Sequence, residues 1–268
     1  MRLAIHHDTT YRYAERVRAS IQYLRLTPQN SARQRVLDWQ LDLPESARAQ
    51  RDGHGNILHV LTLDEPHQAI VIGAHGQVEI DESCESESDP VSPLPYLRCT
   101  GLTTADAALR EFAAQVCGAR RDRAALIELM AALHRRMPFS PGVTEVETTA
   151  AEAFALGLGV CQDHTHVFLA CARSLGIPAR YVSGYLCTAG SPQLASHAWA
   201  EVWIDGAWYS FDVTNQLTRP ERHIKLAVGL DYLDACPVRG MRRGGQEQMH
   251  AQVQSAPLLQ NQLPSQEQ

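Results

Sequence analysis

Short apolar segments separated by polar turn sequences fill the first hundred residues. The segments are rich in Val, Ile, Leu and Tyr, and turn residues such as Asp52-Gly53 lie between them. This pattern is typical of β-strands joined by tight turns. It predicts strands over residues 2–13, 19–27, 35–43, 56–63 and 68–80. Several short strands in succession indicate a β-sandwich.

Residues 81–100 interrupt this pattern. They are acidic at first and then rich in proline, which is typical of a linker or of a long covering segment. The acidic run over residues 82–89 is interpreted as a solvated loop. Attraction of basic substrates is the alternative role for it.

The spacing of apolar residues becomes helical after residue 100. Over residues 122–137 the apolar side chains recur at intervals of three and four, which is the period of one buried helical face. They are Leu126, Leu129, Met130, Leu133 and Met137, and Pro138 follows them. The sequence therefore predicts a helix that packs on a core and ends at the proline.

Two more helices and a second group of strands are predicted. Thr103 or Thr104 is expected to cap a helix that runs to about Val116. A further helix is expected to start near Cys161 and to end before Gly176. Strands are predicted over residues 179–187, 196–204 and 207–213, with a last one near residues 249–253.

The elements together predict an α+β protein. A β-sandwich domain with its linker is expected over residues 1–100, and a core of helices and an antiparallel sheet over residues 101–255. Residues 256–268 are rich in Gln, Ser and Pro and are expected to form a disordered tail.

Composition narrows the function classes. The 268 residues carry a formal net charge of −6, which argues against a nucleic-acid partner because such proteins usually need a basic face. No run of 18 apolar residues occurs, so no membrane span is expected. The first residues lack an apolar stretch of signal-peptide length, and the seven cysteines are irregularly spaced. We therefore expect a cytoplasmic protein with reduced thiols. Its oligomeric state is left open.

Cys161 is the first candidate for chemistry. It follows Gly157 and Gly159 and stands directly before an apolar-periodic segment, which places the thiol in the first turn of a helix. Free N–H groups and the positive end of the helix dipole favour a thiolate at such a position. The alternative is a buried structural cysteine.

A predicted hairpin brings a histidine and an aspartate together. Asp205-Gly206 is a strong signal for a two-residue turn. If Ile204 and Ala207 flank that turn, Asp212 becomes a diagonal neighbour of His197 on the same face of the sheet, within reach of its side chain. A three-residue turn would move Asp212 to the other face.

Cys161, His197 and Asp212 then have the order of nucleophile, base and orienting group. The imidazole would take the thiol proton and later protonate the leaving amine. Asp212 would fix the ring tautomer. The backbone N–H of Cys161 is a candidate for the oxyanion hole.

Three separated segments resemble the transglutaminase-like superfamily. Residues 159–187 resemble its nucleophile helix and the strand after it, and residues 196–215 resemble its His and Asp strands. Residues 221–240 resemble the C-terminal segment of bacterial members, and residues 1–80 resemble the β-sandwich domain that precedes their core.

This resemblance implies a papain-like catalytic core that acts on amides through a thioester, with Cys161, His197 and Asp212 as the triad. Asp212 is followed by Val-Thr-Asn where many relatives have Pro-Thr-Asn, and no tryptophan lies between Trp39 and Trp199 to serve the oxyanion site that some members use. No calcium dependence is indicated.

The resemblance favours a peptidase or amidase that acts on a peptide or protein substrate. Transfer of a glutaminyl acyl group to an amine, or a non-catalytic binding module on the same fold, are the alternatives. Assistance to peptide-ligase partners is a further hypothesis.

Other polar residues receive weaker predictions. His164, Trp199 and Tyr185 are predicted to bind or support substrate in the cleft, with a contact to the N-terminal domain as the alternative for His164. Asp163, His164 and His166 follow Cys161 closely, but His166 turns away on a helix, so neither a metal nor a cofactor is predicted. Glu201 is expected to pair with a cation or to lie on the surface. The His6-His7-Asp8 sequence is interpreted as ordinary surface.

Overall fold

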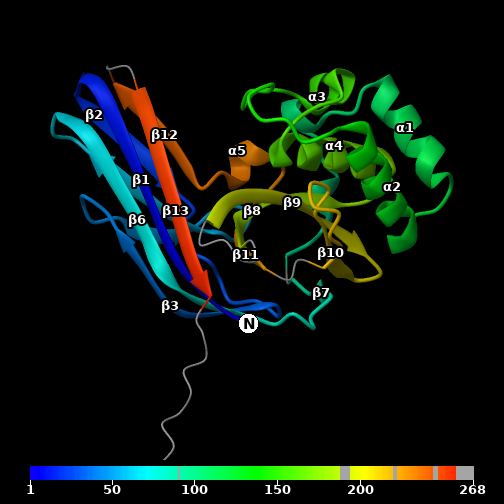
Figure 1. Cartoon of the computed structure of the whole chain (residues 1–268), viewed down its shortest axis with the longest axis horizontal. Coiled ribbons are helices and arrows are strands. Elements are labelled where there is room, and N and C mark those ends of the chain that lie inside the picture. Colours follow the sequence, from blue (N-terminus) through cyan, green and yellow to red (C-terminus); the bar gives the residue numbers. More distant parts are fainter. Residues whose placement is uncertain (90, 188–193, 220–221, 244–246, 258–268) are drawn as a thin grey trace, which may run out of the picture.

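Three antiparallel sheets and a group of helices build the fold (Figure 1). The computed structural model describes residues 1–268 except 90, 188–193, 220–221, 244–246 and 258–268. No helix in the described ranges is long and apolar enough to cross a membrane. The predicted disordered tail lies outside the described residues from residue 258 onward.

Two four-stranded sheets contain the N-terminal strands. The first has the order β13-β1-β6-β3, with β1 at Arg2–Val17, β3 at Gln34–Asp42, β6 at His67–Ile80 and β13 at Glu247–Pro257. The second has the order β12-β2-β5-β4, with β2 at Ala19–Leu24, β4 at Arg48–Arg51, β5 at Ile57–Leu63 and β12 at Val238–Arg243. Both sheets therefore include a strand from the C-terminal end of the chain.

The five predicted N-terminal strands are confirmed, and so is the last strand near residues 249–253. The sequence did not predict β4 or β12, because both strands are short and mostly polar and exposed. Apolar side chains from both sheets, including Leu3, Leu24, Leu61 and Ile72, belong to one hydrophobic cluster.

The third sheet has the order β11-β8-β9-β10-β7. Its strands are β7 at Ser86–Glu87, β8 at Ala179–Cys187, β9 at Leu194–Ile204, β10 at Ala207–Phe211 and β11 at His223–Gly229. Tyr185, Cys187, Ile224 and Leu226 from this sheet join the cluster of the N-terminal sheets. The N-terminal strands thus cover part of the sheet that carries the predicted triad residues His197 and Asp212.

Helices cover the other face of this sheet (Figure 1). They are α1 at Ala107–Cys117, α2 at Arg123–Arg136, α3 at Ala150–Leu156, α4 at Cys161–Ser174 and the short α5 at Tyr232–Ala235. The predicted apolar face of α2 is confirmed, because all five of its residues are buried. The predicted caps Thr103 and Thr104 of α1 are wrong: the Asp106 carboxylate accepts the N–H of Leu109 instead.

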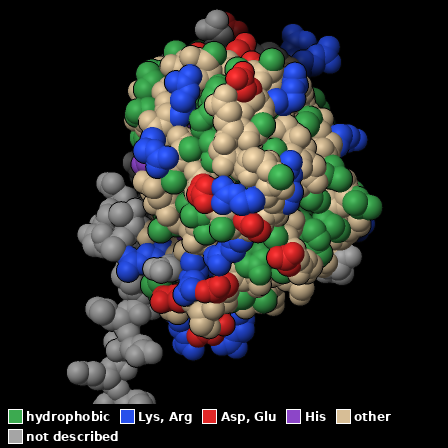
Figure 2. All heavy atoms as spheres, turned by 90° about the vertical axis from the view of Figure 1, so that its right-hand side faces the viewer, with side chains coloured by type: hydrophobic (Ala, Val, Ile, Leu, Met, Phe, Trp, Pro, Cys, Tyr) green, Lys and Arg blue, Asp and Glu red, His purple; other side chains and the backbone are tan. Residues whose placement is uncertain are grey.

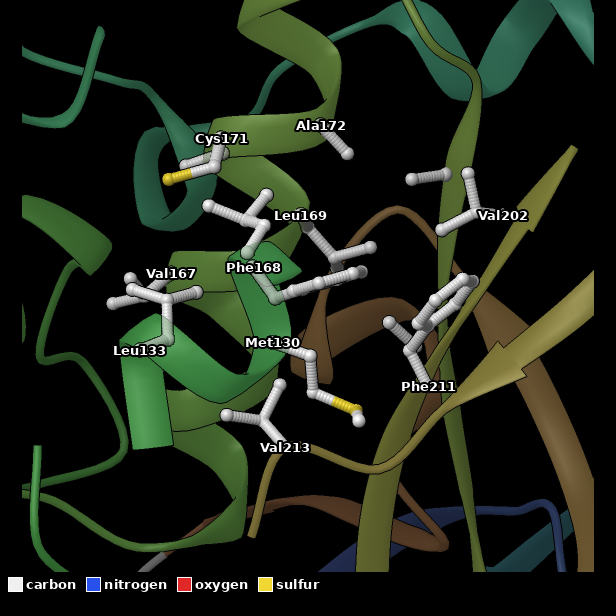
Figure 3. Close-up of a cluster of buried hydrophobic side chains, with 14 of the residues drawn as sticks. Met130, Leu133, Val167, Phe168, Leu169, Cys171, Ala172, Val202, Phe211 and Val213 are labelled. Carbon is white, nitrogen blue, oxygen red and sulfur yellow. The ribbon is translucent and has the colours of Figure 1, made fainter. Parts of the chain in front are cut away.

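The central helix α4 packs on α2 and on β9 (Figure 3). Phe168 stacks on Phe211 with ring centroids 5.2 Å apart, and Val167 and Leu133 lie in the same cluster. Alternate residues in the second half of β9, from Ala198 to Ile204, belong to the same cluster. This packing fixes the start of α4, and therefore Cys161, relative to β9.

The hairpin between β9 and β10 has the predicted register. Ala207 pairs with Ile204, and both turn residues have positive φ angles, 50° at Asp205 and 85° at Gly206. Two positive φ values are characteristic of the tight turn that matches strand twist. The register that places Asp212 near His197 is confirmed.

The acidic run is not a solvated loop throughout, which corrects that prediction. Glu87 lies in β7 and pairs with the Lys225 ammonium, while Asp89 lies 2.6 Å from the Arg180 guanidinium. Glu201, predicted to pair with a cation or face solvent, is buried between the same two cations. Buried cations need carboxylate partners, so the acidic segment folds back onto the sheet.

Candidate active site

Cys161 occupies the first turn of α4, as predicted. Val160 precedes the helix, and the Asp163 carboxylate accepts its backbone N–H at 2.8 Å. Gly159 makes this possible, because a Cβ there would lie 2.6 Å from the Asp163 Cβ. Thr144 donates to the same Asp163 oxygen at 2.7 Å. The helix start is thereby held in place, with the Cys161 side chain partly exposed.

His197 and Asp212 meet as the hairpin register requires. His197 Nε2 donates to Asp212 Oδ2 at 2.8 Å, and the His197 ring also hydrogen-bonds the Cys161 sulfur. Cys161 comes from α4, His197 from β9, and Asp212 is the residue directly after β10. The structure therefore brings the three predicted triad residues into one hydrogen-bonded row.

The protonation of His197 follows from its neighbours. Burial alone would lower its pKa, but the hydrogen bonds and charges of Asp212 and Cys161 outweigh burial and raise the pKa of His197 to about 9. For Asp212, burial opposes ionisation, yet His197 and His223 hold the pKa of its carboxyl well below the usual range. This arrangement favours an imidazolium beside a carboxylate at neutral pH.

Two residues that the sequence did not single out complete the surroundings of Asp212. His223 Nε2, from β11, donates to Asp212 Oδ2 at 2.9 Å. Asn215 donates its side-chain amide to the same oxygen at 2.8 Å and its backbone N–H to Oδ1 at 3.1 Å. Burial lowers the pKa of His223, although Asp212 acts in the opposite direction. His223 therefore serves as a neutral donor.

These contacts also bear on metal binding. The ring nitrogens of His197 and His223 and a carboxylate oxygen of Asp212 lie within 4.8 Å of one another, which is a spacing that could hold an ion. However, three N–H groups already converge on Oδ2 of Asp212, counting that of Asn215. An oxygen with its lone pairs directed at three donors fits a hydrogen-bonded carboxylate better than a metal ligand.

The predicted substrate residues require correction, because each has only 1–2% of its surface exposed. His164 hydrogen-bonds the Met137 carbonyl at 2.8 Å and the Thr214 hydroxyl at 2.9 Å, so it ties α4 to the turn after Asp212. Within the described part of the chain, both hydrogen-bond partners of His164 lie outside the N-terminal sheets, which does not match its predicted contact with the N-terminal domain.

Trp199 and Tyr185 lie behind the site. The Trp199 ring lies nearly parallel to the His197 ring, with centroids 6.2 Å apart, and meets the His223 ring edge-on at 4.9 Å. Tyr185 points to the N-terminal sheets, where it hydrogen-bonds His7 at 2.5 Å. Strand alternation indicated which face these side chains share, but not that other strands cover that face.

Two segments of the chain match the models of known protein families. Residues 3–79 match "Bacterial transglutaminase-like N-terminal region", and residues 110–213 match "Transglutaminase-like superfamily". The second match includes Cys161, His197 and Asp212.

Curated relatives span nearly the whole chain. The uncharacterized protein Rv2569c of Mycobacterium tuberculosis is 30% identical over 273 residues, which cover 90% of this chain and 87% of that protein. The uncharacterized protein ML0607 of Mycobacterium leprae is 29% identical over 266 residues, with coverage of 91% and 94%.

One solved structure shares the fold over almost its full length. It is a crystal structure of a candidate cysteine protease from Cytophaga hutchinsonii, with a TM-score of 0.78 and 24% identity. The match covers 98% of this chain and 93% of that chain. At this identity the likeness shows the fold, with its mixed helices and antiparallel sheets.

Proposed function

The chain belongs to the transglutaminase-like superfamily, and from that premise we propose that it is a cysteine-dependent enzyme that hydrolyses a peptide or isopeptide-like amide. The observation that supports this most strongly is the hydrogen-bonded row of Cys161, His197 and Asp212. It combines a nucleophile at a helix start, a base and an orienting carboxylate, as thiol acyl-transfer chemistry requires.

In the proposed first step, the Cys161 thiolate attacks the amide carbonyl carbon. A C–S bond forms, and the carbonyl π electrons move to oxygen. The backbone N–H of Cys161, at the positive end of α4, is proposed to stabilise this oxyanion. The imidazolium of His197 then donates its proton to the nitrogen, the C–N bond breaks, and the amine leaves a thioester behind.

In the second step, neutral His197 takes a proton from water. The resulting hydroxide equivalent attacks the thioester carbonyl, the C–S bond breaks, and the acid leaves with thiolate and imidazolium restored. Asp212 keeps the His197 ring in one orientation and stabilises its charge through both steps. Asn215 and His223 act through Asp212, since they hold its carboxylate in place.

A polypeptide substrate fits the surface better than nucleic acid does. On the face shown in Figure 2, Lys and Arg side chains are interspersed with Asp and Glu, so no broad basic field covers it. Recognition of a phosphate backbone depends on such a field. We retain a cytoplasmic location as part of the proposal.

Trapping of the acyl-enzyme tests the proposal. The purified chain is incubated with a mixture of peptide amides, quenched in acid and analysed by intact mass and peptide mapping. We expect an acyl adduct on Cys161 that disappears with time in water and is absent from Cys161→Ala. Amide cleavage by Cys161→Ala at the wild-type rate would refute the mechanism.

The same reaction with a primary alkylamine added distinguishes hydrolysis from transfer. Hydrolysis gives the free acid, which carries ¹⁸O when the reaction is run in labelled water. Transfer gives a new amide that carries the added amine and no ¹⁸O. If this amide is the main product, the protein is a transglutaminase and the hydrolase assignment is wrong.

A further inference from the structure

We propose that His6, Asp8, Asp42 and His75 form a binding site for one divalent transition-metal ion, with zinc as the best fit, on the outer face of the first N-terminal sheet. The site is separate from the proposed catalytic row and goes beyond the proposed function. It lies on β1, β3 and β6, which Figure 1 shows on the side of the molecule opposite the helices.

Strand register brings the four side chains together. His6 in β1 pairs directly with His75 in β6, and their rings lie 4.1 Å apart. One step along, Asp8 in β1 and Asp42 in β3 both pair with Gly73 in β6, from opposite sides. Residues 73 and 75 share one face of β6 because side chains alternate, so all four groups rise from the same face.

The potential ligand atoms already lie close together. His6 Nε2 is 2.9 Å from Asp8 Oδ2, and His75 Nε2 is 2.8 Å from Asp42 Oδ2. His75 Nε2 is also 3.9 Å from Asp8 Oδ1. The ligand atoms of His6, Asp8 and His75 lie within 4.8 Å of one another, and Asp42 adjoins them through His75. Ligands that each lie about 2.0–2.2 Å from a tetrahedral zinc ion are about 3.3–3.6 Å apart, so the four side chains would rotate to bind one ion.

Gly73 provides the space at the centre of the cluster. A Cβ at this position would lie 2.8 Å from His75 Nε2, 3.1 Å from Asp8 Oδ1 and 3.2 Å from the Asp42 Cβ. Three of the four side chains therefore converge over the one residue that has no side chain. The His75 and Asp8 ligand atoms border the space that this glycine leaves open.

The donor set and its surroundings suit zinc. Two imidazoles and two carboxylates supply four N and O ligands, which is the number that a closed tetrahedral zinc site uses. Hard cations such as magnesium prefer oxygen ligands and fit less well. Gln40 donates to Oδ1 of Asp42 at 2.6 Å, which leaves Oδ2 for the ion. The His6 side chain is 57% exposed, so an ion can enter directly from solvent.

A bound ion would clamp three strands of this sheet. Between His6 and Asp8, the His7 side chain points to the opposite face and hydrogen-bonds Tyr185 of β8. The clamp would therefore brace the strand that docks on the sheet carrying His197. We expect zinc to raise the melting temperature of the protein, because a ligand that binds only the folded state stabilises it.

The test is zinc titration of the full chain, freed of any affinity tag and stripped with a chelator, in competition with a chromogenic chelator. We expect the wild-type protein to bind one equivalent of zinc. His75→Gln and Asp42→Asn should each weaken the zinc affinity by at least about tenfold, since loss of a residue that only hydrogen-bonds a metal ligand already lowers metal affinity by about 10- to 100-fold. Gly73→Ala should weaken it equally while keeping all four ligands. His59→Gln, on β5 of the other sheet, is the matched control and should bind as wild type does.

The cobalt(II) spectrum and the Cys161→Ala variant distinguish this site from a metal site at Cys161. Cobalt in the proposed site should give visible tetrahedral bands without a thiolate charge-transfer band, and Cys161→Ala should retain the full equivalent. Equal zinc binding by wild type, His75→Gln and Gly73→Ala would overturn the proposal, as would loss of the equivalent in Cys161→Ala. Neither result depends on whether the protein hydrolyses amides.

Discussion

Replacement of Asp212 by Asn removes the charge that holds His197 in its imidazolium form. The His197 pKa of about 9, against an ordinary value of 6.5, corresponds to about 3 kcal/mol in favour of the protonated ring. Without the Asp212 carboxylate, burial is opposed by Cys161 alone, and we expect the pKa of His197 to fall. At pH 8 the protonated fraction should then drop below the roughly nine-tenths that a pKa of about 9 gives.

The sign of the stability effect follows from proton linkage. The folded protein binds the His197 proton more tightly than the unfolded chain, so this stabilisation is complete below pH 6.5 and is lost as the pH rises through about 9. The depressed pKa of Asp212 adds stability that is present above pH 3.8, the ordinary pKa of this carboxyl, and that is lost on acidification. The ion pair therefore stabilises most between pH 3.8 and 6.5.

Denaturant unfolding of wild type and Asp212→Asn across pH 4–10 measures this effect. We expect the difference in unfolding free energy to shrink by up to about 3 kcal/mol between pH 6 and pH 10. A constant difference is expected in addition, because the donors of Asn215 and His223 would face an amide. A difference that does not vary with pH would refute the assignment of the ion pair.

Two further substitutions test the supports of the site. Gly159→Ala should displace Asp163, because the new Cβ would lie 2.6 Å from the Asp163 Cβ. We expect the free energy of unfolding to fall by about 1–3 kcal/mol and alkylation of the Cys161 thiol to become slower. Unchanged values would contradict this. Glu201→Gln should leave the charges of Arg180 and Lys225 without their shared carboxylate. We expect the free energy of unfolding to fall by about 3–5 kcal/mol. A fall of less than about 1 kcal/mol would contradict the role of Glu201 as the shared partner of these two cations.

Local patterns predicted the row of Cys161, His197 and Asp212 because the positions of these residues depend on short-range rules. The turn at Asp205-Gly206 sets the register that brings Asp212 to His197, and the glycine before Val160 together with the apolar period of α4 sets the position of Cys161. Neither relation requires knowledge of the rest of the chain.

The surroundings of the row depend on distant segments and could not be predicted in the same way. His223 reaches Asp212 from β11, which follows a separate stretch of chain, and no local spacing links the two residues. Trp199 and Tyr185 were predicted to meet substrate, but the N-terminal strands and β11 bury them. The strand near residues 249–253 was predicted from its own alternation, but its pairing with β1 was not, because the two strands come from opposite ends of the chain.

The reactivity of Cys161 shows directly whether His197 activates its thiol. The purified protein is treated with a mild thiol alkylator across pH 4–9, and the label is located by peptide mapping. We expect selective labelling of Cys161 below pH 7 and loss of that selectivity in His197→Ala, because an imidazolium partner favours the thiolate. Labelling of Cys161 no faster than the other six cysteines, or unchanged in His197→Ala, would contradict this expectation.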